Sequence, residues 1–263
     1  MRLWTRLVRH FQNHYRNFGK TELSFKSLFR VYNNTYMNEI EELEKRFREL
    51  ASKPKTIEEV AETNRIGEKL SFLRSIETSE MLFELEQAGV KVNTIWDLVN
   101  TRVSYPTAIG ILINHLSKNY HIKNKEAIFR SLAVKEAIGK ASSALIAEYL
   151  KKPKKEENLR WVIGNSIFVT ITKDDVDSIL PIVQDRTNGM SRGRFVCALG
   201  KVKSEKVEGV LINLLDDDEV APQALDALGR LKSQRAKEKI RSLLDHPQPL
   251  IRTEAKKALK KIK

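Results

Sequence analysis

A recurring pair of residues, small or polar followed by aliphatic, constrains the fold of this 263-residue chain more than any other feature. The aliphatic member of the pair occurs at Leu98, Leu132, Ile167, Leu199, Leu228 and Leu259. Successive positions are separated by 34, 35, 32, 29 and 31 residues, and periods of about 20 to 50 residues are typical of solenoids. The sequence therefore predicts a stack of about five to six repeats over residues 93–263.

A second apolar segment repeats within each unit. The segment at 108–116 resembles the one at 207–215, and related segments occur at 179–183 and 240–245. Each unit is therefore predicted to be a helix, a turn and a second helix, with an apolar stripe on both helices. Because a lone hairpin cannot bury both stripes, the units are expected to stack on their neighbours.

Small residues precede the repeated aliphatic position in the C-terminal units. Ala198, Ala227 and Ala258 are expected to let neighbouring helices approach closely. Gly200 and Gly229 follow the repeated Ala-Leu pair, and we expect them to relieve helix ends at the turns.

The C-terminal third carries the most specific motifs, Ala198-Leu199-Gly200, Ala227-Leu228-Gly229 and the run from Leu250 to Leu259. These motifs resemble the short HEAT-like repeats of phycobilisome-lyase-type and many bacterial HEAT-repeat proteins. The resemblance is specific over 190–263 and looser over 93–189, where Phe168 replaces the turn glycine. It implies an all-α, HEAT-like helical-hairpin solenoid forming a right-handed superhelix, with a scaffold or binding role and no catalytic residues.

Residues 1–36 form a basic, amphipathic extension in which leucine, tryptophan and phenylalanine alternate with arginine. Packing onto the repeats, a nucleic-acid arm and, less favoured, a membrane-surface helix are alternative interpretations. A natural start at Met37 is another, because the composition there becomes acidic and strongly helical. Residues 37–92 are predicted to be helices that cap the solenoid, including a helix over 38–51, one opened by the capping box of Thr56 and Glu59, and one ended by Gly89.

Composition narrows the class of protein. The chain has no run of 18 apolar residues, which argues against a membrane-spanning helix. Its single cysteine, Cys197, lies in an apolar stretch and is predicted to be a buried thiol. Without a signal peptide or a disulfide framework, the predicted location is the cytoplasm.

The sequence predicts no cofactor, no metal and no small-molecule substrate. The glycines are scattered singly, without a phosphate-binding loop, and the histidines form no metalloprotease motif. His10 and His14 have helical spacing but are interpreted as a solvated face. The acidic runs 174–175 and 216–219 are expected to stabilise helix N-termini.

One enzymatic alternative is a resemblance in size and basicity to bacterial alkylpurine DNA glycosylases built on HEAT-like repeats. It would use Trp96 or Trp161 as the aromatic residue and Asp97 or Asp174 as the acid. The residue arrangement of that family is not found here, so a non-enzymatic scaffold is the preferred prediction.

The net charge of +13 is concentrated at the two ends, with +6 over 1–36 and +8 over 186–263. Two interpretations of this pattern stand equally, a lysine-rich solubilising surface and an electrostatic footprint for nucleic acid or an acidic partner. A protein partner is predicted first and nucleic acid second. The nucleic-acid alternative would use Arg192, Arg194, Lys201, Lys203, Arg230, Arg235, Lys237, Arg241 and Arg252.

Overall fold

The computed structural model describes residues 25–53 and 56–262, with side chains described from residue 38 onward. All regular secondary structure in this part of the chain is helical, which confirms the predicted all-α class. None of its helices is long and apolar enough to span a membrane. Most of the basic extension at 1–36, including His10 and His14, lies outside the described residues. The described residues fall into two compact units.

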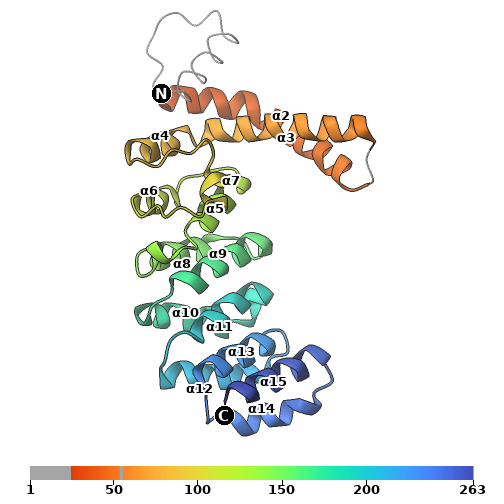
Figure 1. Ribbon diagram of the computed structural model, residues 1–263, viewed down its shortest axis with the longest axis vertical. Coiled ribbons are helices and arrows are strands. Elements are labelled where there is room, and N and C mark those ends of the chain that lie inside the picture. Colours follow the sequence, from red (N-terminus) through yellow and green to blue (C-terminus); the bar gives the residue numbers. More distant parts are fainter. Residues whose placement is uncertain (1–24, 54–55, 263) are drawn as a thin grey trace, which may run out of the picture. The chain divides into compact units, whose positions relative to one another are not determined.

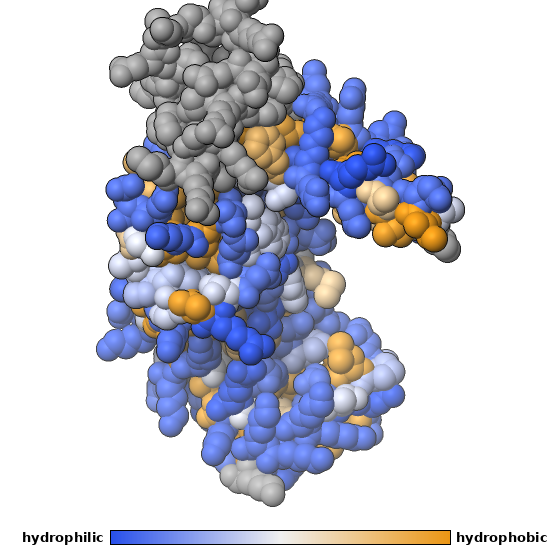
Figure 2. Space-filling model, turned by 45° about the horizontal axis from the view of Figure 1, so that its top comes forward, coloured by the Kyte–Doolittle hydropathy of each residue, from blue (hydrophilic) through white to orange (hydrophobic). Residues whose placement is uncertain are grey.

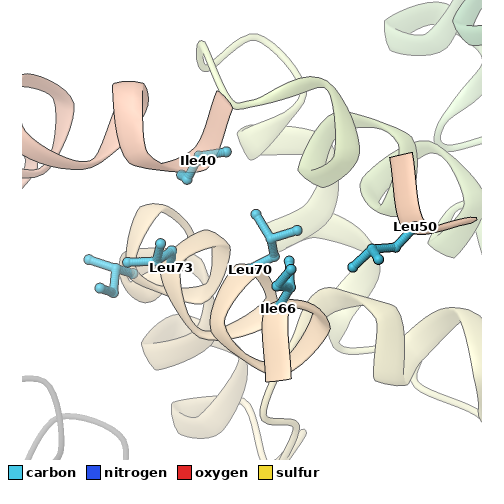
Figure 3. Close-up of a cluster of buried hydrophobic side chains, with 6 residues drawn as sticks. Ile40, Leu50, Ile66, Leu70 and Leu73 are labelled. Atoms are coloured by element: carbon cyan, nitrogen blue, oxygen red, sulfur yellow. The ribbon is translucent and has the colours of Figure 1, made fainter. Parts of the chain in front are cut away.

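The first unit comprises residues up to Val103, together with 118–125. Its helices are α2 (Phe25–Ala51), α3 (Ile57–Glu77), α4 (Ser79–Gln87) and α5 (Ile95–Asn100). Helices α2 and α3 lie side by side (Figure 1). Their contact buries Ile40 and Leu50 from α2 against Ile66, Leu70 and Leu73 from α3 (Figure 3).

Two signals predicted for the helix ends of this unit are confirmed. Thr56 caps α3, because its hydroxyl accepts from the Glu59 N–H at 3.2 Å while the Glu59 carboxylate accepts from the Thr56 N–H at 3.1 Å. Gly89 follows α4 with φ of +81°, the left-handed conformation expected of it. Helix α2 begins at Phe25, well before the predicted start at Asn38, so it crosses the predicted boundary between 36 and 37.

The second unit comprises residues 104–117 and 126–263. Its α-helices are α6 (Ala108–His115), the end of α7 (Ile122–Ser131), α8 (Ser142–Lys151), α9 (Glu157–Thr170), α10 (Val176–Gln184), α11 (Gly193–Leu199), α12 (Glu205–Asn213), α13 (Ala221–Leu231), α14 (Lys237–Ser242) and α15 (Pro249–Lys261). Short 3₁₀ helices are η1 (Lys135–Ala137), η2 (Lys173–Asp175), η3 (Arg186–Arg192), η4 (Leu214–Asp216) and η5 (Leu243–Asp245).

Consecutive helices of the second unit pair as hairpins, α8 with α9, α10 with α11, α12 with α13 and α14 with α15 (Figure 1). The second helices of these hairpins, α9, α11, α13 and α15, also pack on one another in sequence order. We call them the second-helix row. This architecture is the predicted helical solenoid.

The repeated aliphatic position forms the core. Its first five members, from Leu98 to Leu228, are at most 3% exposed, and Leu259 in the last helix is half-buried. The period read from the sequence therefore marks buried positions.

The two glycines after the Ala-Leu pair lie where neighbouring second helices approach closely. Gly200 has φ of −63°, and Gly229 lies inside α13, which ends instead at Lys232 with φ of 53°. A Cβ atom at Gly200 would lie 2.6 Å from Cα of Ala227, and one at Gly229 would lie 3.1 Å from Cα of Ala258. Both glycines allow close contact between neighbouring second helices. Gly200 also ends α11 as its C-cap residue, as predicted, whereas Gly229 does not end α13.

Candidate anion-binding surface

Three cationic side chains surround one aromatic ring on the second-helix row. Phe168 lies near the end of α9, Arg194 near the start of α11, and Arg230 near the end of α13. Cζ of Arg194 lies 4.5 Å from the centroid of the Phe168 ring, and Cζ of Arg230 lies 5.2 Å from it. Nζ of Lys201, just after α11, lies 5.3 Å from the same centroid. We call these four residues the Phe168 cluster.

The stacking of the repeats creates this cluster, because its residues come from three successive hairpins. Arg194 approaches α9 at Gly164, where a Cβ atom would lie only 2.9 Å from Cβ of Arg194. A larger residue at Gly164 would move α11 away from α9. Gly164 therefore provides the close approach between α9 and α11, as Gly200 does between α11 and α13. Position 168 can then hold a residue with an aromatic ring.

Lys201 is fixed by the end of α9. Its ammonium group donates to the carbonyl oxygens of Phe168 at 2.8 Å and Val169 at 3.2 Å, where the helix dipole favours a positive charge. Burial and the nearby charge of Arg230 lower the pKa of Lys201 below its ordinary value. The lysine charge is thus held in place without a carboxylate partner among the described residues.

Positive charge exceeds negative charge at this surface. Asp226 pairs with Arg230 at 2.9 Å and with Lys261 at 3.0 Å. Arg194 forms no ion pair within the described part of the chain, and its Nε is buried without a hydrogen-bond partner there. Asp226 therefore compensates two cations, and no carboxylate pairs with Arg194 or Lys201 within the described residues, which leaves the cluster able to attract an anion.

The nine basic residues predicted for nucleic acid have different environments. Arg194, Lys201 and Arg230 form the cluster, whereas Arg192 is fully buried. Arg235 pairs with Glu208, Arg241 pairs with Glu238, and Arg252 donates to the carbonyls of His246 and Pro247. Lys203 is exposed and Lys237 is half-buried. The structure therefore gathers three of the nine at one place.

Arg192 has a structural environment. Its guanidinium donates to Asp217 at 2.7 Å, Glu219 at 2.9 Å and the Val183 carbonyl at 2.9 Å. Two residues of the acidic run 216–219 thus fix a cation of the preceding hairpin, and Asp216 pairs with Lys239 of the following one. The run connects neighbouring repeats, a role that differs from the predicted stabilisation of a helix N-terminus.

The residues considered for a glycosylase are divided between the two units, with one tryptophan and one aspartate in each. Trp96 and Asp97 belong to the first unit, and Trp161 and Asp174 belong to the second. The Asp97 carboxylate accepts from the N–H groups of Asn93 and Thr94, so it caps α5. Asp174 is exposed at the start of η2.

Other candidate chemistry is limited within the described residues. They include no group of three or more metal-ligating His, Cys, Asp or Glu side chains. Cys197 is a buried free thiol, as predicted, and burial raises its pKa above the ordinary value. A raised pKa keeps the thiol protonated and less nucleophilic at neutral pH.

The visible surface is mainly hydrophilic. Figure 2 shows small, separate hydrophobic patches among charged and polar residues. In the second unit, the large exposed apolar side chains include Ile138, Leu150, Met190 and Leu250, which come from four different segments. Charge therefore distinguishes the Phe168 cluster from its surroundings more than apolar area does.

Phe168 was not predicted as a site residue, although the sequence contained a signal. It occupies the position that corresponds to Gly200 and Gly229 in later repeats, and a large aromatic residue there departs from the repeat pattern. The contact with three cations could not be inferred, because it depends on how far each hairpin is offset from the next.

Comparison with known families agrees with this architecture. The sequence profile of HEAT repeats matches residues 176–260, which cover the hairpins from α10 to α15. With the stacked hairpins, the match supports a HEAT-like repeat protein, and HEAT repeats commonly mediate protein interactions. A search of curated proteins found no significant match to the chain.

Proposed function

We propose that this protein is a non-enzymatic scaffold or adaptor whose HEAT-like repeats bind a protein partner. The observation that carries the proposal is the pairing of surface charge. Several basic residues that follow the Phe168 cluster in the sequence form ion pairs with carboxylates. These pairs include Arg235 with Glu208, Arg241 with Glu238 and Lys257 with Glu254. The resulting surface mixes both charges, and such surfaces favour a partner with its own charge pattern.

Nucleic acid is the second candidate, and the net charge of +13 and the Phe168 cluster favour it. Duplex DNA carries one charge for about every 1.7 Å of its axis, so a bound protein usually supplies many cations along a path. The described residues place three of the nine candidate cations together and pair others internally. This arrangement fits one local anionic contact better than a phosphate track.

We also propose the repeat type, source and location that the sequence predicts. The Ala-Leu-Gly motifs and the short repeat period support a relationship to the phycobilisome-lyase type of HEAT-like repeat and a bacterial source. A cytoplasmic location and a role without a catalytic step, cofactor or metal belong to the same proposal.

A salt series with nucleic acids tests the choice of partner. Purified full-length protein would be titrated with duplex DNA, single-stranded DNA and RNA between 50 and 200 mM salt. We expect weak binding, with Kd no tighter than about 10⁻⁶ M at physiological salt, as for non-specific contacts. A variant with glutamine at Arg2, Arg6, Arg9 and Arg16 would show how much of that binding the basic extension supplies. Tight binding that falls by about 10³-fold over this range would contradict the proposal and favour nucleic acid.

A further inference from the structure

The three positive charges of the Phe168 cluster repel one another, and a bound anion would relieve this repulsion. Three cationic groups lie within 5.3 Å of one ring centroid. Repulsion between like charges is strong at such short distances. The ring offsets part of this repulsion, because the face of an aromatic ring attracts cations.

The donors of the cluster are available for a carboxylate. Arg230 uses Nε to hold Asp226 at 2.9 Å, and no other hydrogen bond of its guanidinium is found within the described residues. Arg194 pairs with no carboxylate there, and although its Nε atom is buried, the side chain as a whole is partly exposed. Guanidinium groups bind carboxylates through two parallel hydrogen bonds, which makes both arginines suitable anchors.

Neighbouring charges limit the size of the anion. Lys261 already shares Asp226 with Arg230, and Lys257 pairs with Glu254 on the last helix of the row. The positive surface is therefore a local cluster that suits two or three carboxylates. A short acidic segment supplies this number, whereas a nucleic-acid backbone would place many more charges against compensated or acidic surface.

We infer that Phe168, Arg194, Lys201 and Arg230 form a docking site for a short aspartate- and glutamate-rich segment of a protein partner. This inference rests on the proposed function and adds the chemistry of the segment that the scaffold recognises. The arginines bind the carboxylates, Lys201 adds a fixed positive charge, and the half-buried ring of Phe168 supports the arginines and contacts the aliphatic part of the segment.

Peptide binding to the full chain tests the site. The probe is a rhodamine-labelled peptide of four Asp-Glu pairs, measured by fluorescence anisotropy at 50 mM salt, with the matching Asn-Gln peptide as the neutral control. We expect the acidic peptide alone to bind. The double variant Arg194→Gln/Arg230→Gln is expected to weaken binding by about tenfold or more, since tenfold corresponds to 1.4 kcal/mol and charge-assisted hydrogen bonds are worth about this much each.

A matched variant separates the cluster from overall charge. Arg235→Gln/Arg241→Gln removes the same two charges from exposed, internally paired arginines. It is expected to change the peptide Kd by less than about twofold, because exposed pairs contribute little and salt screens their distant charge. Equal weakening by both double variants would overturn the inference, since overall charge would then explain the binding.

Two further results would overturn the inference. One is no binding of the acidic peptide by the wild-type protein at 50 mM salt. The other is tighter binding of a single-stranded oligonucleotide of equal charge that Arg194→Gln/Arg230→Gln abolishes, which would assign the cluster to phosphate. If the double variant has a lowered unfolding midpoint, Arg194→Lys tests the same contact with the charge retained. It is expected to weaken binding by about threefold, because an ammonium group cannot bind a carboxylate through two parallel hydrogen bonds.

Failure of the site and failure of the proposed function give different results. A wild-type protein that binds neither peptide nor nucleic acid loses the docking site but keeps the proposed scaffold role. Tight, salt-sensitive binding of nucleic acid removes the proposed function itself.

Discussion

Replacing Arg192 by alanine is expected to lower the free energy of unfolding of the second unit by about 3–5 kcal/mol. The guanidinium of Arg192 is fully buried between Asp217, Glu219 and the carbonyls of Val183 and Gly189. Its removal leaves Asp217, which is only 7% exposed, without its closest cation. Urea unfolding followed by circular dichroism measures the change.

A surface arginine and a double variant provide the controls for this prediction. Arg241→Ala breaks an exposed pair with Glu238 and is expected to cost less than about 1 kcal/mol. Arg192→Met combined with Asp217→Asn removes both buried charges, so it is expected to destabilise less than the two single substitutions added together. A cost for Arg192→Ala as small as that of Arg241→Ala would contradict the buried ion pair.

Replacing Gly200 by alanine is expected to destabilise the second unit by about 1–3 kcal/mol. The backbone at Gly200 is helical, so alanine fits its conformation. The new Cβ atom would nevertheless lie 2.6 Å from Cα and 2.9 Å from Cβ of Ala227, and relief would require α11 and α13 to move apart. The midpoint of urea unfolding measures the change.

Two other glycines give a graded control. Gly229→Ala places its Cβ atom 3.1 Å from Cα of Ala258, so we expect a smaller loss than at Gly200. Gly209 lies inside α12 with nothing within 4 Å of an added Cβ, and alanine there is expected to stabilise by about 0.5–1 kcal/mol through helix propensity. Equal effects at Gly200 and Gly209 would show that propensity, and not close approach, controls both positions.

Much of this fold could be predicted because its signals are local or periodic. The Thr56 capping box and the end of α4 at Gly89 depend on residues within one helical turn of each other, and both were predicted correctly. The buried repeat positions, such as Ile167 and Leu199, recur at similar intervals along the chain, so one unit predicts the next. Periodicity identifies which residues are buried between repeats.

Contacts between specific side chains of different repeats could not be predicted in the same way. In the sequence Arg192 resembles the exposed Arg186, and its burial depends on Asp217 and Glu219 of the next hairpin. The role of Gly200 depends on how closely α13 approaches, which a turn-glycine rule does not describe. The Phe168 cluster similarly requires the offset between three hairpins, which no single repeat contains.

Site-specific photo-crosslinking tests the central claim that the second-helix row binds an acidic protein segment. A benzophenone-bearing phenylalanine would replace Phe168 or, as the matched control, Leu150, which is 64% exposed on α8. In the source cell, we predict a discrete protein adduct from position 168 only, mapping by mass spectrometry to an aspartate- and glutamate-rich segment and lost when the acidic peptide competes in extract. Adducts of equal yield from both positions, or an adduct from position 168 that nuclease removes, would contradict this account.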